Sequence, residues 1–389
     1  MTHSPKGSIV RKELVSILSD LIALPSPYPP GTSVEICAYA AKRLKKAGYK
    51  VEIATHKKGV DNVVARMRGK GKGPVIAFNA HVDTVGVGER ANWKTDPFKA
   101  IVKGGLVYGL GAGNCKGSMA VQLWLAEEIA RLGGPKKGEL IFTFVADEEN
   151  LGPEGMEYLR KSGKVRPDAL ILGAQTENNL IVAERGVMWA KITTRGRAAH
   201  AGNPGAGDNA ILRMMRLMTR LQSYYDKALR TRVSGAMKST VNLGMFHGGH
   251  NTNVVPSACT VEIDRRLLPN EKVKDAFAEL KRVIDGAGEP KSEYKVEFLT
   301  GTNGFFAPEN GKTVAAFEAA VKQKTGRKVK FLNATGVSDG RYYADDRIEI
   351  INFGPGSGVQ GHAANESVPI AEMVEAAEIQ LDVVNRLLG

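Results

Sequence analysis

Three short and almost uninterrupted apolar runs constrain the fold of this chain more than any other feature. They are Leu140 to Val145, Ala169 to Leu172 and Ile348 to Phe353. Such runs are typical of strands that are buried on both faces, as in a parallel sheet covered by helices. Helical patterns separate or follow them at 119–132, 312–324 and 370–388. The outer parts of the chain are therefore predicted to form an α/β domain around a mostly parallel, mixed sheet.

The middle of the chain has a different pattern. Strands are predicted at 187–195, 239–247, 258–267 and 294–299, with helices at 208–225 and 272–284. The resulting order, β-α-β-β-α-β, is that of a ferredoxin-like unit. We therefore predict an outer domain made of residues 1–185 and 300–389, and an inserted domain at 186–299.

The composition excludes several classes of protein. A chain of 389 residues with 43% hydrophobic residues is ordinary for a globular enzyme. Lys and Arg outnumber Asp and Glu by 54 to 41, but they are scattered and not interleaved with aromatic residues, so no nucleic-acid partner is predicted. No stretch is long enough to span a membrane, and the three cysteines show no disulfide or zinc spacing. We expect a cytoplasmic protein without a membrane partner.

A histidine and an aspartate follow the predicted strand at 75–78, in the sequence Asn79-Ala-His81-Val-Asp83. Residues two apart in an extended segment face the same side, so His81 and Asp83 can act together. A carboxylate behind a histidine commonly fixes the ring of a metal ligand. A surface ion pair would give the same pattern.

Two further segments place polar side chains after buried strands. The run ending at Val145 is followed by Asp147-Glu148-Glu149, at the end of the strand where open α/β sheets bind their ligands. One of these carboxylates can bind a metal while its neighbour acts as a base, although an acidic solvated loop is the alternative. The run ending at Phe353 leads to a glycine-rich loop that carries His362.

A glycine-rich turn at 108–118 precedes the helix predicted at 119–132. It lacks the Gly-Lys-Ser/Thr ending of a phosphate-binding loop, and its glycines do not fit G-x-G-x-x-G. The turn therefore needs an explanation other than phosphate.

Taken together, six motifs resemble the M20 metallopeptidase family, and they extend over nearly the whole chain. They are His81-Val-Asp83, Gly109 to Gly117 with Lys116, Asp147-Glu148-Glu149, Gly202-Asn-Pro204 after His200, Thr335 to Arg341, and His362 to Glu366. The family includes acetylornithine deacetylase, succinyl-diaminopimelate desuccinylase, carboxypeptidase G2 and aminoacylases. The resemblance implies a zinc-peptidase-like catalytic domain with two zinc ions bridged by an aspartate and a water, and a lid domain that dimerises.

The resemblance also implies roles for the residues that match the family's catalytic motifs. His81 matches a ligand of the first metal, and Asp83 the carboxylate that supports it. Glu148 matches the general base. Glu149 and His362 match the ligands of the second metal.

Four more residues match positions that contact the substrate in the family. His200, in the predicted lid, matches a histidine that reaches the active site of the partner subunit and stabilises the oxyanion. Asn253, Arg266 and Arg341 match positions that hold the substrate and its carboxylate.

Two ligand positions depart from the family pattern. The bridging aspartate should fall at position 114, which is Asn114, and the usual Gly-Glu-Pro-Thr is replaced by Gly173-Ala174-Gln175-Thr176. An amide is a poorer bridge between two dications than a carboxylate, and alanine is no ligand. We therefore predict one divalent metal per subunit, zinc or manganese, held by Glu149 and His362 and completed by His81 or Asn114.

The sequence thus predicts a metal-dependent hydrolase of a carbon–nitrogen bond, other than an internal peptide bond, in a small substrate that carries a carboxylate. The protein is expected to be a homodimer formed through the lid domain. Three alternatives remain open: Gln175 or Glu177 replaces the missing ligand, the site deaminates an unusual amine, or the chain binds a ligand without turning it over.

Overall fold

The computed structural model describes residues 5–308, 310–334 and 336–389, and the chain divides into two compact units. The first unit comprises Met1–Val182, Ala307–Leu332 and Ser338–Gly389, and the second comprises Ala183–Phe306 and Asn333–Val337. Thr335, the first residue of one family motif, lies outside the described residues. The roles predicted for the two domains, catalytic and lid, remain predictions.

The main sheet, most of which lies in the first unit, has the strand order β1-β2-β6-β3-β7-β17-β8-β15, and β16 (Phe331–Ala334) also pairs with β8. The bounds are β1 Lys50–Lys57, β2 Val60–Arg68, β3 Gly71–His81, β6 Lys137–Val145, β7 Ala169–Gly173, β8 Leu180–Glu184 and β17 Glu349–Phe353. The central strands β6, β3, β7 and β17 pair in parallel, whereas β1, β2 and β8 pair antiparallel at the two sides. The predicted α/β fold with a mixed sheet is confirmed, and the parallel part is its centre.

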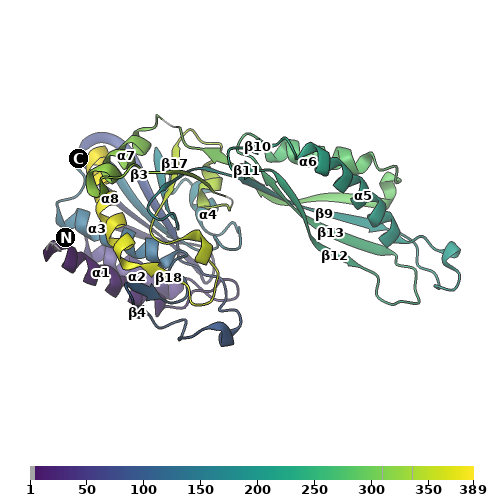
Figure 1. Cartoon of the computed structure of the whole chain (residues 1–389), viewed down its shortest axis with the longest axis horizontal. Coiled ribbons are helices and arrows are strands. Elements are labelled where there is room, and N and C mark those ends of the chain that lie inside the picture. The colour runs from purple at the N-terminus through teal and green to yellow at the C-terminus, as the bar shows by residue number, and fades with distance from the viewer. Residues whose placement is uncertain (1–4, 309, 335) are drawn as a thin grey trace. The chain divides into compact units, whose positions relative to one another are not determined.

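Helices cover this sheet and bury its apolar side chains (Figure 1). They are α1 Pro5–Ile22, α2 Val34–Lys46, α3 Lys116–Arg131, α4 Met156–Lys161, α7 Lys312–Thr325 and α8 Ile370–Leu388. Helix α3 packs against α1, α8 and β3, and most of its residues are buried. The position of α3 matters for function, because the glycine-rich turn leads directly into its first residue.

Short elements complete the first unit. Strands β4 Ile101–Lys103, β5 Leu106–Tyr108 and β18 Ser367–Pro369 form a small sheet, with the order β18-β5-β4. The 3-10 helices are η1 Arg90–Asn92, η4 Asp339–Tyr343 and η5 Gly358–Gln360, and β16 spans Phe331–Ala334. The small sheet places the segment that carries Glu366 beside the start of the glycine-rich turn, because Ser367 pairs with Tyr108.

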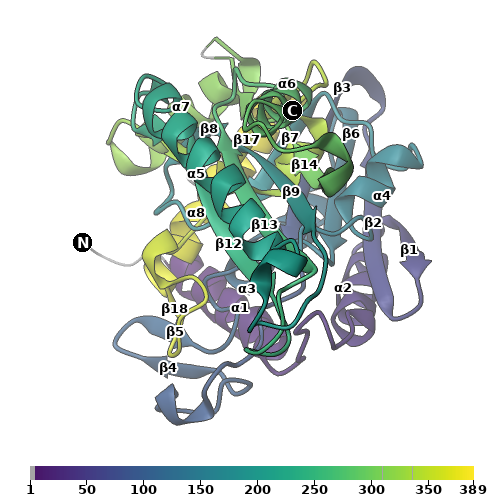
Figure 2. The ribbon, with the colours of Figure 1, turned by 90° about the vertical axis from the view of Figure 1, so that its right-hand side faces the viewer.

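The second unit is built on an antiparallel sheet with the order β12-β13-β9-β14. Its elements are β9 Gly186–Arg195, η2 Pro204–Ala206, α5 Ala210–Ala228, β10 Val233–Ser234, β11 Met237–Lys238, β12 Thr240–Gly248, β13 Ala258–Leu267, α6 Val273–Asp285, η3 Lys291–Glu293, β14 Tyr294–Thr302 and β15 Phe305–Phe306. Figures 1 and 2 show α5 and α6 on one face of this sheet, where they enclose a core of their own. Apart from the small β10–β11 hairpin and the two-residue strand β15, the order is the predicted β-α-β-β-α-β.

Within the described residues, no helix has both the length and the apolar character needed to cross a membrane.

Candidate metal centre

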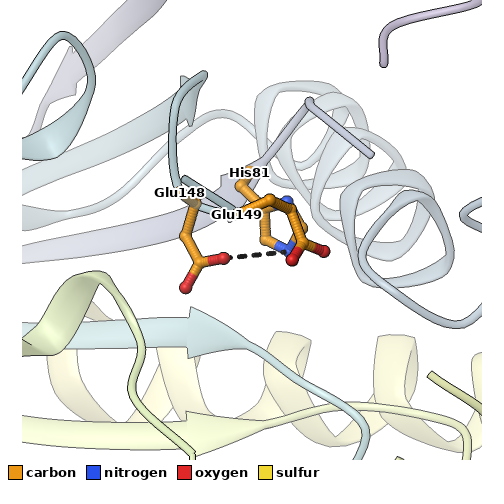
Figure 3. Close-up of side chains that lie close together, drawn as sticks. All are labelled: His81, Glu148 and Glu149. Carbon is orange, nitrogen blue, oxygen red and sulfur yellow. Dashed lines mark ion pairs between the residues drawn. The ribbon is translucent and has the colours of Figure 1, made fainter. Parts of the chain in front are cut away.

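Two predicted metal ligands, His81 and Glu149, and the predicted base Glu148 lie at the carboxyl ends of the parallel strands β3 and β6. His81 is the last residue of β3 and pairs with Val145, the last residue of β6. Glu148 and Glu149 follow Val145 by three and four residues, so the register of two neighbouring strands brings them to His81. Figure 3 shows the three side chains together, and their ligand atoms all lie within 4.8 Å of one another.

The ring of His81 is held from behind by Asp83. Its Nδ1 lies 2.9 Å from the backbone oxygen of Asp83 and 3.5 Å from the carboxylate oxygen Oδ1. A carbonyl oxygen can only accept a hydrogen bond, so the N–H of Nδ1 donates to it and Nε2 points the other way. Nε2 lies 3.4 Å from Oδ1 of Asn114 and 3.9 Å from Oε2 of Glu148. Nε2 is therefore the nitrogen of His81 that faces the carboxylate cluster.

Asp83 connects two of the site's segments. Its side chain is fully buried, and Oδ2 accepts a hydrogen bond of 3.1 Å from the backbone N–H of Glu149. Its Oδ1 has no hydrogen-bond partner among the described residues and faces His81. This is the arrangement expected of a carboxylate that supports a metal-binding histidine.

Asn114 joins the remaining ligands through its side-chain amide. Its Nδ2 donates a hydrogen bond of 2.6 Å to Oε1 of Glu149 and lies 3.1 Å from Nε2 of His362. Nε2 of His362 is itself 2.9 Å from Oε1 of Glu149. Burial raises the pKa of Glu149, but the hydrogen bond with His362 and the charge of His81 outweigh it, so that this pKa lies below its usual range. Glu149 is therefore ionised and available as a ligand at neutral pH.

Glu148 has a different electrostatic environment. Burial raises its pKa to about 8, against the opposing charges of His81 and Arg341. Its Oε1 lies 3.5 Å from Nη1 of Arg341, and Oε2 is the oxygen that faces His81. Two adjacent carboxylates whose pKa values are moved in opposite directions are typical of a ligand beside a general base.

The glycine-rich turn is held by Glu366. The backbone N–H groups of Gly111, Gly113 and Asn114 donate to its buried carboxylate, over 2.8, 3.1 and 2.6 Å respectively. Lys116 fixes the other side of the turn, because its Nζ donates to the carbonyl oxygens of Leu21 and Leu24, both at 2.9 Å. The glycines thus let the backbone wrap a carboxylate of the protein itself and place Asn114 among the ligands.

Position 174, where the family has a metal ligand, and the residues that follow it differ in the metal-binding atoms that they offer. Ala174 has no donor atom. The side chain of Gln175 lies against Gly113, where any side chain would collide with Nε2 of Gln175. This nitrogen has no hydrogen-bond partner among the described residues. The side chain of Glu177 is exposed.

Three predicted substrate residues belong to the second unit. Nδ1 of His200 accepts a hydrogen bond of 3.0 Å from the N–H of Gly202, and its ring is exposed. Asn253 lies on the neighbouring segment, where its backbone oxygen accepts a bond of 2.9 Å from Ala201. Arg266 is held by Asp264, which accepts from Nε at 2.8 Å and from Nη2 at 2.9 Å. His200 and Asn253 thus lie on adjacent loops, and Arg266 lies on β13.

The donor set can be tested against the metals that such a family implies. Imidazole nitrogens and carboxylate oxygens suit zinc or manganese, and His81, Glu149 and His362 offer these atoms, with Glu148 next to them. At position 114, an amide N–H₂ group, which has no lone pair to give, faces Glu149 and His362. His81 and Glu149, with Glu148 beside them, therefore offer atoms close enough for one divalent cation, and His362 lies next to Glu149. Position 114 offers no carboxylate that could bridge two cations.

Sequence reasoning missed several residues that shape this site. In the sequence, Glu366 stands out only as the end of a motif, and the motifs predict no role for Asn79 or Asp339. Nδ2 of Asn79 donates to Oδ2 of Asp339 over 3.0 Å, and this hydrogen bond is buried. Buried polar residues on otherwise apolar strands, such as Asn79 on β3, were the available signal.

Comparisons with known proteins agree with this geometry. The family model described as peptidase family M20/M25/M40 matches residues 77–386. A succinyl-diaminopimelate desuccinylase from Xanthobacter autotrophicus is 28% identical over 96% of this chain and 98% of the relative. An N-formyl-4-amino-5-aminomethyl-2-methylpyrimidine deformylase from Halalkalibacterium halodurans is 26% identical over 96% of this chain and 94% of the relative. Among solved structures, an M20 family metallo-carboxypeptidase from Sulfolobus solfataricus shares the fold, with a TM-score of 0.80 at 18% identity over 97% of this chain and 99% of that chain.

Proposed function

The chain belongs to peptidase family M20/M25/M40, and from this premise we propose that it hydrolyses a carbon–nitrogen bond in a small substrate that carries a carboxylate. Membership makes the chain a hydrolase and confirms the resemblance inferred from its motifs. The observation that carries the proposal is the convergence of His81, Glu148 and Glu149 within 4.8 Å at the ends of parallel strands. We further propose that one divalent cation, zinc or manganese, is bound per subunit by His81, Glu149 and His362.

Glu148 is the proposed general base. A cation held by the three ligands would polarise the scissile carbonyl group and lower the pKa of a water molecule. Oε2 of Glu148 accepts the proton of the attacking water and then delivers it to the leaving nitrogen. Asp83 keeps the proton of His81 on Nδ1 and so keeps Nε2 directed at the site.

The substrate is proposed to be an N-acyl amine with a nearby carboxylate. The names of two relatives describe removal of a succinyl and of a formyl group from an amine, which supports a deacylase. Asn253 and Arg266 are proposed to bind the substrate carboxylate. Because Asp264 already holds Nε and Nη2 of Arg266, that carboxylate would bind at Nη1 or displace Asp264.

The protein is proposed to be a cytoplasmic homodimer that pairs through the second unit, with His200 acting in the active site of the partner subunit. Strand β12 is an edge of its sheet and carries the exposed side chains of Met245 and Phe246, while Leu212 and Met215 are exposed on α5. Exposed apolar side chains beside an unpaired strand edge favour association. Light scattering of wild type and of Phe246→Glu tests this, since a wild-type monomer would contradict it.

The experiment that tests the function is a substrate panel with one pair of variants. The panel contains succinyl-diaminopimelate, N-acetyl and N-formyl amino acids, dipeptides and free amines, each with zinc- or manganese-loaded protein. Glu148→Gln should lower kcat about 10²- to 10⁴-fold with little change in KM, because a base acts in the transition state. Glu154→Gln is the matched control: Glu154 follows in the same loop, and it is paired with His56 at 2.6 Å.

Two results would overturn the proposal. Unchanged turnover in Glu148→Gln would remove this residue from the mechanism. No bound metal and no turnover of any compound would favour a ligand-binding protein, for which Asn114 and Ala174 are the supporting observation. Release of ammonia from a free amine would identify deamination.

A further inference from the structure

Arg341 is the one predicted substrate residue in the described part of the first unit, and its side chain is enclosed. The side chain is only 1% exposed and lies on η4. Nη1 is 3.5 Å from Oε1 of Glu148, which is the outer limit of a hydrogen bond, and the side chain of Glu148 is only 13% exposed. A guanidinium in this position already has a carboxylate of the protein as its counter-ion.

The aromatic residue next to it anchors this guanidinium. Nη2 of Arg341 donates a hydrogen bond of 2.9 Å to the hydroxyl group of Tyr342, and the guanidinium carbon lies 4.4 Å from the centre of the Tyr342 ring. The same hydroxyl group donates to the backbone oxygen of Gly152 over 2.7 Å. Gly152 lies in the loop that begins after β6 and carries Glu148, so η4 and this loop are connected at two points.

A second chain of contacts connects Arg341 to the strands that carry the ligands. Nη2 of Arg341 lies 4.0 Å from Oδ1 of Asp339, whose Oδ2 accepts from Nδ2 of Asn79 at 3.0 Å. Oδ1 of Asn79 in turn accepts from the hydroxyl group of Thr143 at 2.8 Å. Asn79 and Thr143 lie on β3 and β6, so the guanidinium is fixed relative to the strands that position His81 and Glu148.

We propose that Arg341 is a positioning residue that holds Oε1 of Glu148, so that Oε2 is the oxygen directed towards His81 and the attacking water. This inference rests on the proposed role of Glu148 as a base. It replaces the substrate-binding role expected for Arg341 from the sequence. The two oxygens of an unheld carboxylate exchange by rotation about one bond, whereas a guanidinium fixed by a ring, a hydroxyl group and a second carboxylate selects one orientation. Figure 3 shows Oε2 on the side of His81.

The kinetic test uses Arg341→Ala and Arg341→Lys, with the panel compound that wild type cleaves fastest. For Arg341→Ala we expect kcat to fall on the order of 100-fold, the cost of a small misplacement of a reacting group, with KM nearly unchanged. Added guanidinium ion should restore part of kcat in Arg341→Ala. Introducing Arg341→Ala into Glu148→Gln should cause little further loss, because Arg341 acts through Glu148.

The control and a milder variant guard against general damage to the fold. Arg160→Ala is the matched control, because Arg160 also lies over a tyrosine ring of η4, at 5.6 Å from the centre of Tyr343, but is paired with Asp346. Its kcat should stay near wild type. Tyr342→Phe removes one anchor of the guanidinium and keeps the ring, so it should lower kcat several-fold even if Arg341→Ala fails to fold.

A crystal structure of metal-loaded Arg341→Lys tests the inference without any substrate. The carboxylate of Glu148 should rotate or become disordered while Glu149 stays in place. An unchanged Glu148 carboxylate would overturn the inference, and so would a rise in KM at constant kcat, which would show a substrate-binding role. The inference would also be overturned if Arg341→Ala lowered kcat by the same factor in Glu148→Gln as in wild type. Full activity of Glu148→Gln alone would refute the proposed function instead.

Discussion

Replacing Glu366 by Gln tests how Asn114 is held in place. The change keeps the size of the side chain, removes its charge and exchanges one acceptor oxygen for an N–H₂ group. In the native protein, Oε1 accepts from Gly113 and Asn114, while Oε2 accepts from Gly111. In Glu366→Gln, the amide oxygen can take the place of only one of these oxygens. At best it keeps the two bonds of Oε1, and the N–H₂ group then faces the N–H of Gly111.

The structure sets the size of the effect. A hydrogen bond to a charged group contributes about 1.5–3 kcal/mol, roughly twice a neutral one. Losing one such bond and weakening two should cost about 3 kcal/mol of unfolding free energy, which for a unit of this size is a decrease in Tm of about 6–12 °C. The control is Glu372→Gln, because Oε2 of Glu372 accepts from the N–H of Gly356 at 2.8 Å, and this carboxylate accepts no other hydrogen bond from the described residues. That substitution should cost about 1 kcal/mol.

Urea unfolding followed by tryptophan fluorescence measures the difference. The chain has three tryptophans, and Trp189→Phe leaves Trp93 and Trp124, which both lie in the first unit. Each variant is compared in this background. If Glu366→Gln unfolds at the same urea concentration as Glu372→Gln, the turn does not depend on Glu366 and the reasoning is refuted. A loss of metal affinity in Glu366→Gln should accompany the loss of stability.

Two further predictions concern the metal and the second unit. Removal of the metal by a chelator should abolish turnover and lower Tm, because a metal that binds only the folded state stabilises it. Added zinc or manganese should restore both turnover and Tm. Elemental analysis that finds two metals per subunit would contradict the single site. Arg232→Ala should destabilise the second unit by about 1 kcal/mol at pH 7, because Arg232 donates to Glu279 at 2.9 Å and to Glu271 at 3.0 Å. Burial raises the pKa of Glu279, but Arg232 outweighs it and holds this pKa below the usual 4.5. The stabilisation by this ion pair is therefore complete above pH 4.5 and is lost as the pH falls through the lowered pKa of Glu279. The difference in stability between Arg232→Ala and wild type should consequently be smaller at pH 3 than at pH 7. An equal difference at both pH values would contradict the assignment.

The sequence allowed the fold to be predicted where burial leaves a clear pattern. Leu140 to Val145 and Ile348 to Phe353 are mostly apolar because nearly all of their side chains are buried on both faces, and both runs are central parallel strands. The direction of β1 and β2 could not be predicted, because an antiparallel strand has the same side-chain period as a parallel one. The position of β17 between β7 and β8 was equally hidden, since strand order depends on pairing between distant segments.

The site was predictable only in part, for a related reason. His81, Glu148 and Glu149 could be assembled because each follows a recognisable strand, and the structure brings their ligand atoms within 4.8 Å. The carboxylate of Glu366 accepts hydrogen bonds from a turn more than 250 residues earlier in the chain, so no local sequence pattern predicts this contact. The enclosure of Arg341 likewise depends on Tyr342 and on the Gly152 loop packed against it. Motif spacing shows which residues meet, but not which of their atoms are already occupied.

The place of β17 in the sheet also affects how the protein is made. A ribosome releases β3, β6 and β7 early, then the whole second unit, and only afterwards Glu349–Phe353, which must pair beside β7. Until then β7 keeps an open edge, a surface on which nascent chains aggregate. His362 emerges later still, so the candidate metal centre cannot form before translation is nearly complete. A newly made chain should therefore need protection, for example by a chaperone, during synthesis of the inserted unit.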